Sequence, residues 1–541
     1  MAGISAVIPR AADECVMRTA CRGEQVAPRT EVWVLAATIL GSGMASIDGT
    51  AVNVALPTMQ RSLHATAADL QWVIEAYSLF LASLILVGGS LGDRLGRRRV
   101  YSAGIVIFTV ASVACGASPT VGILIAARCL QGIGAACLVP GSLAIISASF
   151  DPSRRGKAIG TWAGFSAITT AVGPVLGGWL TQFVSWRAVF LINVPISAVT
   201  LFLLYRHVPE SRDDEATGRI DWLGALLVTG ALGGIVFGLI EAGPRGFGTV
   251  LVAGSLIAGA ALLVAFVMVE ARSSSPMVPL DLFRSRNFTG ANLLTLLLYG
   301  GLGGSLYFLP FDLQQVQGYA PTAAGAAFIP FPIIVFTLSR WAGGLVQRYG
   351  ARLPLIVGPI VTAVGISLFA LPDTGGSYWT TFFPAVVVMS LGMTLVIAPL
   401  TTTVMNAVPT HRSGVASGIN NAVTRAAGLL AIAVLGLLVA TAFSSSLDSQ
   451  LNSLHVSPAV KTSLDAQRSK FVDAAVPAAV SQPERAQIET ALKEAFVTGF
   501  RLSMLIAAAL AVASAFLAAW LIDGKQPEPA ERMVAEPAPA R

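Results

Sequence analysis

A glycine-rich basic turn occurs twice in this chain, each time between two long apolar segments. Residues 88–99 read GGSLGDRLGRRR, and residues 342–352 read AGGLVQRYGAR. When Gly96 is aligned with Gly350, glycine, leucine and arginine also coincide at four other positions. Because parallel repeats of membrane helices are an architecture of transporters, this repeat predicts a duplicated membrane protein.

The composition also indicates a membrane protein. Of 541 residues, 54% are hydrophobic and 12% are charged, whereas soluble domains carry about 25% charged residues. The net charge of +6 would suit nucleic-acid binding, but the basic residues lie in short loops beside apolar segments, where they orient membrane helices. The five cysteines, at positions 15, 21, 115, 129 and 137, have neither metal-ligand spacing nor a disulfide framework. We therefore expect the lipid bilayer as a partner, no nucleic acid and no metal.

Fourteen segments are long and apolar enough to cross a membrane, which takes about 20 residues. They cover 33–57, 70–91, 100–117, 120–148, 158–181, 187–206, 221–241, 249–269, 288–310, 322–342, 353–372, 380–405, 414–441 and 498–522. The expected fold class is an all-α polytopic membrane protein with both termini on one side. The flanking segments 1–30 and 523–541 are expected to be disordered, with no signal peptide in the first.

Charge predicts the orientation of these segments. The gaps that would be cytoplasmic contain clusters such as Arg97–Arg99 and Arg154–Lys157, whereas the short external gaps contain only Arg61, Arg187 and Arg245. This bias predicts cytoplasmic N- and C-termini in the cytoplasmic (inner) cell membrane. The long gap 442–497 would be external. Its basic residues do not contradict this orientation, because the charge bias applies only to short loops.

The repeated turn resembles the loop between segments 2 and 3 of the major facilitator superfamily. In that family the acid and the arginines are thought to latch the cytoplasmic ends of helices. The resemblance assigns this role to Gly89, Asp93, Arg94, Gly96, Arg97 and Arg98. The second copy has Gln347 in place of the acid. The alternative is a merely basic cytoplasmic turn.

The spacing of the two copies implies two additional segments. The copies are 254 residues apart, whereas six spans with short loops take about 200 residues. Twelve segments plus a central pair resemble the fourteen-segment drug:proton antiporter branch, of the quaternary-ammonium or multidrug exporter type. The expected domains are a first six-helix bundle at 31–206, a two-helix insertion with linkers at 207–287, and a second bundle at 288–522 that includes the loop 442–497.

Two acids and one arginine are the candidate proton-coupling residues. Asp48 and Glu75 lie roughly 13 and 8 Å below the outer ends of their segments. A carboxylate in hydrocarbon must be paired, hydrated or protonated, so two acids at similar depth are candidates for proton exchange. Asp48 belongs to a first-helix signature of the resembled branch, and an acid near Glu75 is associated there with cationic drugs. The alternatives are a structural hydrogen-bonding acid at Asp48 and interfacial hydration of Glu75.

Arg128 lies in segment 4, in RCLQGIGAACLVPG, which resembles the arginine motif of the superfamily. An arginine this deep in an apolar segment needs a partner. The resemblance implies pairing with polar groups of segment 1 and an influence on proton transfer. The alternative is that Arg128 only holds helices together.

Segment 5 resembles the antiporter motif, which is typical of exporters rather than uptake symporters. The matching residues are Gly164, Gly173, Pro174, Gly177 and Gly178. Their spacing permits close helix packing, and generic packing is the alternative. Further candidates for the cavity are Asn53, Gln131, Asp312, Asn420, Asn421 and Arg425. Asp312 would attract cations at the vestibule or be a solvated acid at a helix end, and the asparagines and Arg425 would line the cavity or bond between helices.

The sequence contains no phosphate-binding loop, no histidine–glutamate metal cluster and no nucleophile motif, so we expect neither an enzyme nor a cofactor. The resemblance implies a monomeric exporter that exchanges amphipathic, cationic drugs or antibiotics for protons by alternating access. The alternatives are a dedicated exporter of one endogenous metabolite, an uptake symporter, and a membrane receptor that binds ligand without moving protons.

Overall fold

The computed structural model describes residues 28–212, 220–409, 412–477 and 480–523. The segments predicted to be disordered, 1–30 and 523–541, lie almost entirely outside the described residues. Within the described ranges the chain is helical and has no strand.

The first group of helices includes the first six predicted membrane segments. It consists of α2 (Pro28–Leu63), α3 (Ala67–Leu95), α4 (Arg97–Ala117), α5 (Val121–Ser149), α6 (Pro152–Phe183), the short α7 (Ala188–Leu191) and α8 (Asn193–His207). Local sequence explains two of the boundaries. Thr66 and Asp69 form a capping box at the start of α3. Gly96 alone separates α3 from α4, with φ at 107°, a conformation that favours glycine.

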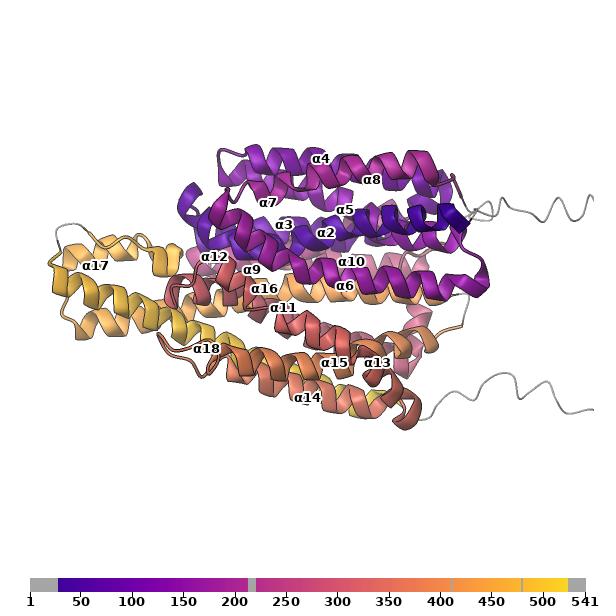
Figure 1. Ribbon diagram of the computed structural model, residues 1–541. Coiled ribbons are helices and arrows are strands. Elements are labelled where there is room, and N and C mark those ends of the chain that lie inside the picture. Colours follow the sequence, from indigo (N-terminus) through magenta and orange to yellow (C-terminus); the bar gives the residue numbers. More distant parts are fainter. Residues whose placement is uncertain (1–27, 213–219, 410–411, 478–479, 524–541) are drawn as a thin grey trace, which may run out of the picture.

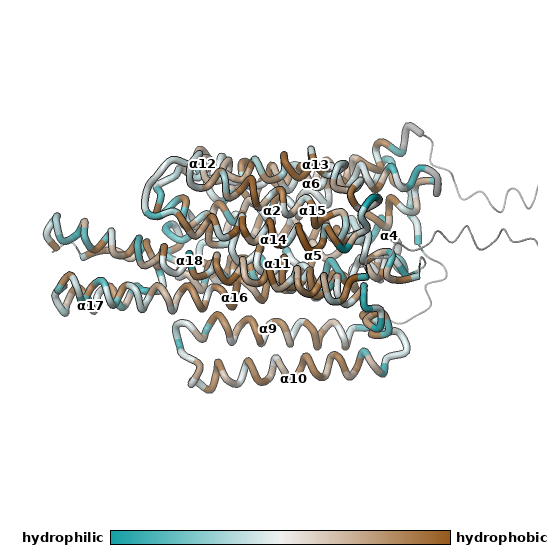
Figure 2. The backbone as a smooth tube through the Cα atoms, turned by 90° about the horizontal axis from the view of Figure 1, so that it is seen from below, coloured by the Kyte–Doolittle hydropathy of each residue, from teal (hydrophilic) through white to brown (hydrophobic). Residues whose placement is uncertain are grey.

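A two-helix hairpin follows, α9 (Trp222–Arg245) and α10 (Val250–Arg272). α9 packs against α3 and α16, whereas α10 packs mainly against α9. Figure 2 shows the hairpin along one edge of the molecule.

The second group contains the remaining helices. It consists of η1 (Leu280–Arg284), α11 (Arg286–Phe311), the π-helical turn η2 (Asp312–Val316), α12 (Pro321–Ala326), α13 (Pro330–Tyr349), α14 (Arg352–Leu368), α15 (Phe382–Asn406), α16 (Ser413–Ser453), α17 (Pro458–Asp465), η4 (Arg468–Asp473) and α18 (Gln482–Leu521). Thirteen described helical segments have the length and composition of a membrane span, and the shorter apolar helix Arg352–Leu368 corresponds to the remaining predicted segment, 353–372. The predicted all-helical polytopic fold is therefore confirmed.

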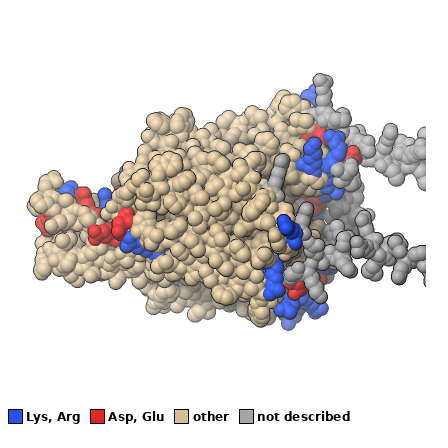
Figure 3. All heavy atoms as spheres, turned by 60° about the horizontal axis from the view of Figure 1, so that its bottom comes forward, with Lys and Arg blue, Asp and Glu red and all other residues tan. Residues whose placement is uncertain are grey.

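The two groups of helices lie side by side. In Figure 1 the helices α2 to α8 form the upper part and α11 to α18 the lower part. The start of α2 and the end of α18 lie at the same end of the molecule, which we call the terminal end. Charged side chains gather at this end and at the opposite one, and Figure 3 shows a broad face between them without charge. This distribution suits a protein embedded in a bilayer.

The opposite end carries a helical extension, which we define as residues 442–497. The sequence predicted a long external loop here, and the described part of this loop is largely helical. α16 and α18 have 41 and 40 residues, or about 60 Å each, which is twice the thickness of the hydrocarbon layer. Arg468 bonds to Asp448 of α16 and to Asp465, which holds η4 against the long helices.

Candidate functional site

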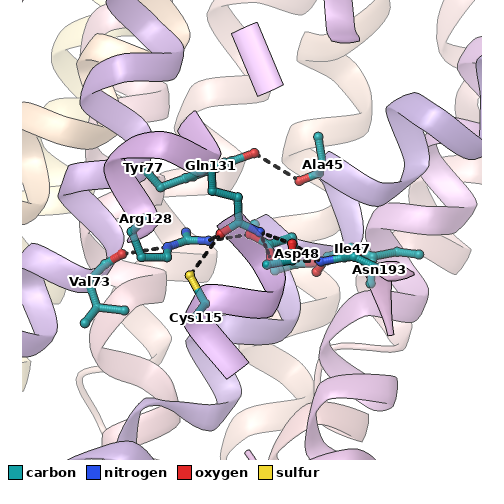
Figure 4. A network of polar contacts seen from close by, with 12 residues as sticks. Ala45, Ile47, Asp48, Val73, Tyr77, Cys115, Arg128, Gln131 and Asn193 are labelled. Carbon is teal, nitrogen blue, oxygen red and sulfur yellow. Dashed lines mark hydrogen bonds and ion pairs between the residues drawn. The ribbon is translucent and has the colours of Figure 1, made fainter. Parts of the chain in front are cut away.

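A buried charge network occupies the interior of the first group of helices. Nη1 of Arg128 on α5 donates to Oδ2 of Asp48 on α2 over 2.5 Å and to Oε1 of Gln131 over 2.7 Å. Gln131 in turn donates through Nε2 to the second oxygen of Asp48, over 2.8 Å. All three side chains have no exposed surface, and Figure 4 shows them pointing toward one another. The predicted partnership of Arg128 with segment 1 is thus present in the structure.

α3 fixes the orientation of the guanidinium. Nε of Arg128 donates to the carbonyl oxygen of Val73 over 2.9 Å. The guanidinium carbon lies 4.2 Å from the centre of the Tyr77 ring, which is a cation–π contact. The Tyr77 hydroxyl donates to the carbonyl of Ala45 on α2. Three helices therefore define the position of Arg128.

Two further side chains complete the network, and sequence reasoning did not select them. Asn193 at the start of α8 donates to Asp48 over 3.3 Å and to Ser112 on α4 over 3.2 Å. Ser112 also accepts from Gln131 over 2.9 Å. Asn193 is a polar amide among apolar residues, which is a usable signal, whereas a lone serine such as Ser112 carries none.

The network is almost, but not fully, satisfied. Asp48 accepts from Arg128, Gln131 and Asn193, so its charge is well compensated. Nη2 of Arg128 and Oδ1 of Asn193 are buried and have no hydrogen-bond partner within the described part of the chain. An unsatisfied buried polar group costs about 1–3 kcal/mol, so an additional hydrogen-bond partner for either atom would stabilise the network.

Glu75 lies apart from this network. Val73 and Tyr77 face Arg128, and Glu75 is two residues from each, or about 200° away around α3. Glu75 is fully buried, and in the described structure neither of its carboxylate oxygens has a hydrogen-bond partner. Tyr307 on α11 interacts with it electrostatically. Asp48 contacts Arg128 on one side of α3, and Glu75 faces the other side, so the two acids do not share one network.

The face of α3 that carries Glu75 packs against the hairpin and the second group. Trp72 and Leu79, one turn before and after, belong to a cluster with Val236 of α9 and Leu429 of α16. Glu75 is therefore a carboxylate at the interface between the two groups of helices.

The second group contains a separate polar cavity of about 200 Å³ near the terminal end. Asn420 and Asn421 line it, together with Tyr299, Thr401 and Ser417. Asn420 donates to Thr295 and Asn292 of α11, so it also bonds between helices. Asn420 thus bonds between helices and also lines this cavity, and its role in transport stays a prediction.

Arg425 and Asn53 lie outside this cavity. Arg425 acts electrostatically on Tyr77 across the interface, and among the described residues it has no ion pair. Asn53 donates to Gly49 of its own helix, and its Oδ1 is buried without a partner in the described chain.

Asp312 is not a solvated acid at a helix end. It is 2% exposed and begins the π-helical turn η2. The only hydrogen bond that the structure describes for its carboxylate comes from Gln317 Nε2, at 3.4 Å.

The basic turn connects elements within the first group. Asp93 pairs with Arg97 over 2.8 Å, and the backbone N–H of Arg97 donates to Ser211 after α8. The backbone N–H of Arg98 donates to Glu210, and its side chain donates to the Val208 carbonyl.

The remaining latch positions have different surroundings. A side chain at Gly96 would lie 2.7 Å from the Glu210 carboxylate, and a Cβ at Gly89 would lie 3.4 Å from Pro140. Arg94 has no ion pair in the described structure. The turn thus joins α3 and α4 to the end of α8, and Glu210, which sequence reasoning missed, is its acidic partner.

The glycines of the antiporter motif serve two contacts. A Cβ at Gly173 or Gly177 would collide with Thr50 or Ala51 of α2, so both glycines allow α6 to approach α2. A Cβ at Gly178 would lie 2.3 Å from the carbonyl oxygen of Pro321 on α12.

The contact with α12 is reciprocal. A Cβ at Gly325 would lie 2.1 Å from the carbonyl oxygen of Pro174. Gly164, in contrast, has no neighbour within 4 Å of its ideal Cβ, so it contributes to neither contact. Close packing thus explains four of the five motif residues.

This fold and this buried charge network define a polytopic helical protein of two related groups of spans. The chain belongs to the major facilitator superfamily, whose family model matches residues 38–432. The multidrug resistance protein Stp of Mycobacterium tuberculosis is 36% identical over 505 residues, covering 91% of this chain and 92% of that protein. The tetracenomycin C resistance and export protein of Streptomyces glaucescens is 32% identical over 515 residues, covering 94% of each chain.

Solved structures share the fold. A bacterial homologue of the human lysosomal transporter Spinster, in an inward-facing and unoccupied conformation, matches with a TM-score of 0.62 at 18% identity. The match covers 91% of this chain and 98% of that chain. The xylose transporter XylE from E. coli, in an inward-open conformation, matches with a TM-score of 0.56 at 15% identity, over 93% and 98% of the two chains.

Proposed function

We propose that this protein exports amphipathic, cationic drugs or antibiotics across the cytoplasmic membrane in exchange for protons, as a monomer. Relatives that match more than nine-tenths of the chain bear the names of multidrug resistance and export proteins. The observation that carries proton coupling is the ion pair between Asp48 and Arg128, which is fully buried. An intramembrane ion pair of this kind is characteristic of proton relays.

The pair supplies a proton switch inside the first group of helices. Arg128, Gln131 and Asn193 all donate to the Asp48 carboxylate and compensate its charge. A proton on Asp48 removes the charge that holds the guanidinium, and Arg128 then depends on Val73 and Tyr77. Val73 and Tyr77 lie on α3. Protonation of Asp48 therefore weakens the link between α5 and α2 and leaves the link between α5 and α3.

The two groups of helices would rock about the interface that contains Glu75. The extension end is closed where α6 meets α12 and where Gln314 donates to the carbonyl of Val54 on α2 over 2.8 Å. The cavity beside Asn420 lies nearer the terminal end. This arrangement supports an inward-facing state in which the terminal end is cytoplasmic and the extension is external.

Glu75 would receive the cationic part of the substrate. A buried carboxylate without a protein partner gains the most from an incoming cation, which offsets its burial. A proton that replaces the substrate on this carboxylate from the external side would favour substrate release.

The deciding experiment is a drug-susceptibility panel in an efflux-deficient host, with and without a protonophore. We expect raised resistance to cationic amphipathic compounds that the protonophore abolishes. Asp48→Asn, expressed to the same level, is the matched inactive control. Protection that survives the protonophore would contradict proton coupling.

Inside-out vesicles test the rival functions. Proton-driven accumulation of drug in these vesicles is expected for an exporter. Movement of substrate in the opposite direction would indicate an uptake symporter, and binding without proton flux would indicate a receptor. Resistance confined to one compound would favour the dedicated exporter.

A further inference from the structure

A second buried acid lies in the second group of helices, outside the proton switch described above. Asp312 continues α11 as the first residue of η2, where the backbone N–H of Gln317 donates to the Asp312 carbonyl over 2.9 Å. This five-residue spacing is that of a π-helical turn, which is rare and occurs frequently at functional sites. Gly318, with φ at 75°, ends the turn.

The same turn carries the contacts that close the extension end. Gln314 donates to the carbonyl of Val54 on α2, and Gln315 donates over 2.9 Å to the Gln60 side chain of the same helix. Gln60 also donates to the carbonyl of Lys470 in η4. Two successive glutamines of η2 thus tie the second group of helices to the first.

The Asp312 carboxylate is poorly compensated in this closed arrangement. Its hydrogen bond from Gln317 is long, and Gln317 also donates to the Asp373 carbonyl over 2.9 Å. Arg501 on α18 acts electrostatically on Asp312, but its guanidinium bonds to Asp373. Nε of Arg501 is buried without a hydrogen-bond partner in the described chain.

The other elements around η2 offer Asp312 no countercharge. Tyr319, just after the turn, interacts with it electrostatically, and α12 has no charged residue. η4 brings Lys470 and Asp473, which act on each other rather than on Asp312. Burial raises the pKa of the Asp473 carboxyl, which faces Arg61, Lys470 and His64.

We propose that Asp312 takes up a proton when the extension end closes, so that it is a gating residue which links external acidity to closure. The proposal rests on the proton-driven exchange proposed above. A buried carboxylate with one long hydrogen bond is costly when ionised, whereas the neutral acid fits this environment. When the end opens, water reaches the turn and the ionised form becomes acceptable. A proton supplied from outside would therefore favour closure and the return of the cavity to the terminal side.

A cavity lies beside the turn at the extension end. The cavity, of about 430 Å³, is lined by Gln314 and Gln315 on one side and by Arg61, Asp473 and Lys493 on others. Its charged lining suits water, and it lies at the extension end next to η2. Asp312 is buried and does not line this cavity, so we expect water to reach it only when the glutamine contacts open.

Hydrogen–deuterium exchange of the full-length protein in lipid nanodiscs, without substrate, tests the proposal. The reporters are residues 51–63 of α2 and residues 467–476, after correction for intrinsic exchange rates at pH 6 and pH 8. In the wild type, both reporters should be several-fold better protected at pH 6. Asp312→Asn, which is permanently neutral, should show the protected pattern at both values of pH.

Two variants keep the experiment interpretable. Asp312→Glu retains a titratable group and should retain the dependence on pH. Glu494→Gln removes an exposed acid of α18 that does not act on Asp312, and it should also retain the dependence. The proposal is overturned if Asp312→Asn keeps the wild-type dependence on pH, or if Glu494→Gln abolishes it. Because this measurement uses no substrate, its outcome is independent of vesicle transport, where failure of the wild type to accumulate drug would instead contradict the proposed function.

Discussion

Asp48 is the residue on which the charge network depends. It accepts from Arg128, Gln131 and Asn193, and these donors come from α5 and α8. Removing one member of a buried ion pair typically costs about 3–5 kcal/mol, because the other charge stays buried without compensation. The two members therefore differ in what their loss does: loss of the acid removes the proton site, and loss of the arginine leaves an uncompensated carboxylate.

We predict that Asp48→Asn abolishes drug accumulation driven by a pH gradient but spares passive exchange of drug. Asparagine keeps the shape of the side chain and the acceptor oxygen but cannot cycle a proton. Arg128→Ala should damage both activities. The measurement is drug exchange in proteoliposomes with and without a gradient.

The exposed acid Asp151 provides the control for this pair, because Asp151→Asn changes a carboxylate outside the network. Its activity should equal that of the wild type. Wild-type accumulation by Asp48→Asn would show that the proton is carried elsewhere.

Glu75→Gln should impair transport of cationic drugs more than transport of neutral ones. The carboxylate is fully buried without a hydrogen-bond partner in the described structure, so a cation gains there and a neutral molecule does not. Efflux rates of a cationic compound and its uncharged isostere provide the comparison. An equal loss for the two compounds would refute a role for Glu75 in charge recognition.

Among the elements, α6 has the most to do with closure of the extension end. It approaches α2 through Gly173 and Gly177, and it approaches α12 through Gly178. The first contact lies within one group of helices and the second lies between groups. Only the second must break when the molecule changes state.

Gly178→Ala should hinder closure of the extension end and slow transport. The new methyl group would lie 2.3 Å from the Pro321 carbonyl oxygen, and overpacking of this kind costs about 1–3 kcal/mol, or roughly a five- to 150-fold shift in the equilibrium. Transport rate and exchange protection of residues 321–326 should both fall.

Gly164→Ala is the matched control on the same helix, because its methyl group would meet nothing within 4 Å. It should leave the rate and the protection unchanged. If the two variants behave alike, the effect comes from replacing a glycine anywhere on α6 and not from the contact of α6 with α12.

At the scale of the whole molecule, the start of α2 and the end of α18 both lie at the terminal end, opposite the extension. With the charge bias of the loops, this arrangement predicts a cytoplasmic terminal end and an external extension. Alkaline phosphatase fused after Gly375 should be active in cells, and a fluorescent protein fused after Asp523 should fluoresce. The reverse pattern of activities would invert the proposed orientation and, with it, the direction assigned to closure.

The sequence alone determined the number and position of the membrane segments, because hydrocarbon tolerates few charges and an apolar segment of about 20 residues is a local property. It also determined that Asp48 and Arg128 need partners, since a buried charge is costly wherever it lies. The repetition of the basic sequence placed the turn at residues 88–99, and the resemblance to the antiporter motif selected the glycines of α6.

Only the tertiary structure decided which groups meet. Asn193 on α8 donates to Asp48, and Ser112 on α4 accepts from Gln131 and Asn193. Glu75 faces away from Asp48, and Glu210 is the acidic partner of the basic turn. These pairings depend on the rotation and depth of helices that are far apart in sequence, which packing sets and local pattern does not. The extension 442–497 is helical for a related reason: its polar helices are held by contacts such as those of Arg468, which no hydropathy rule detects.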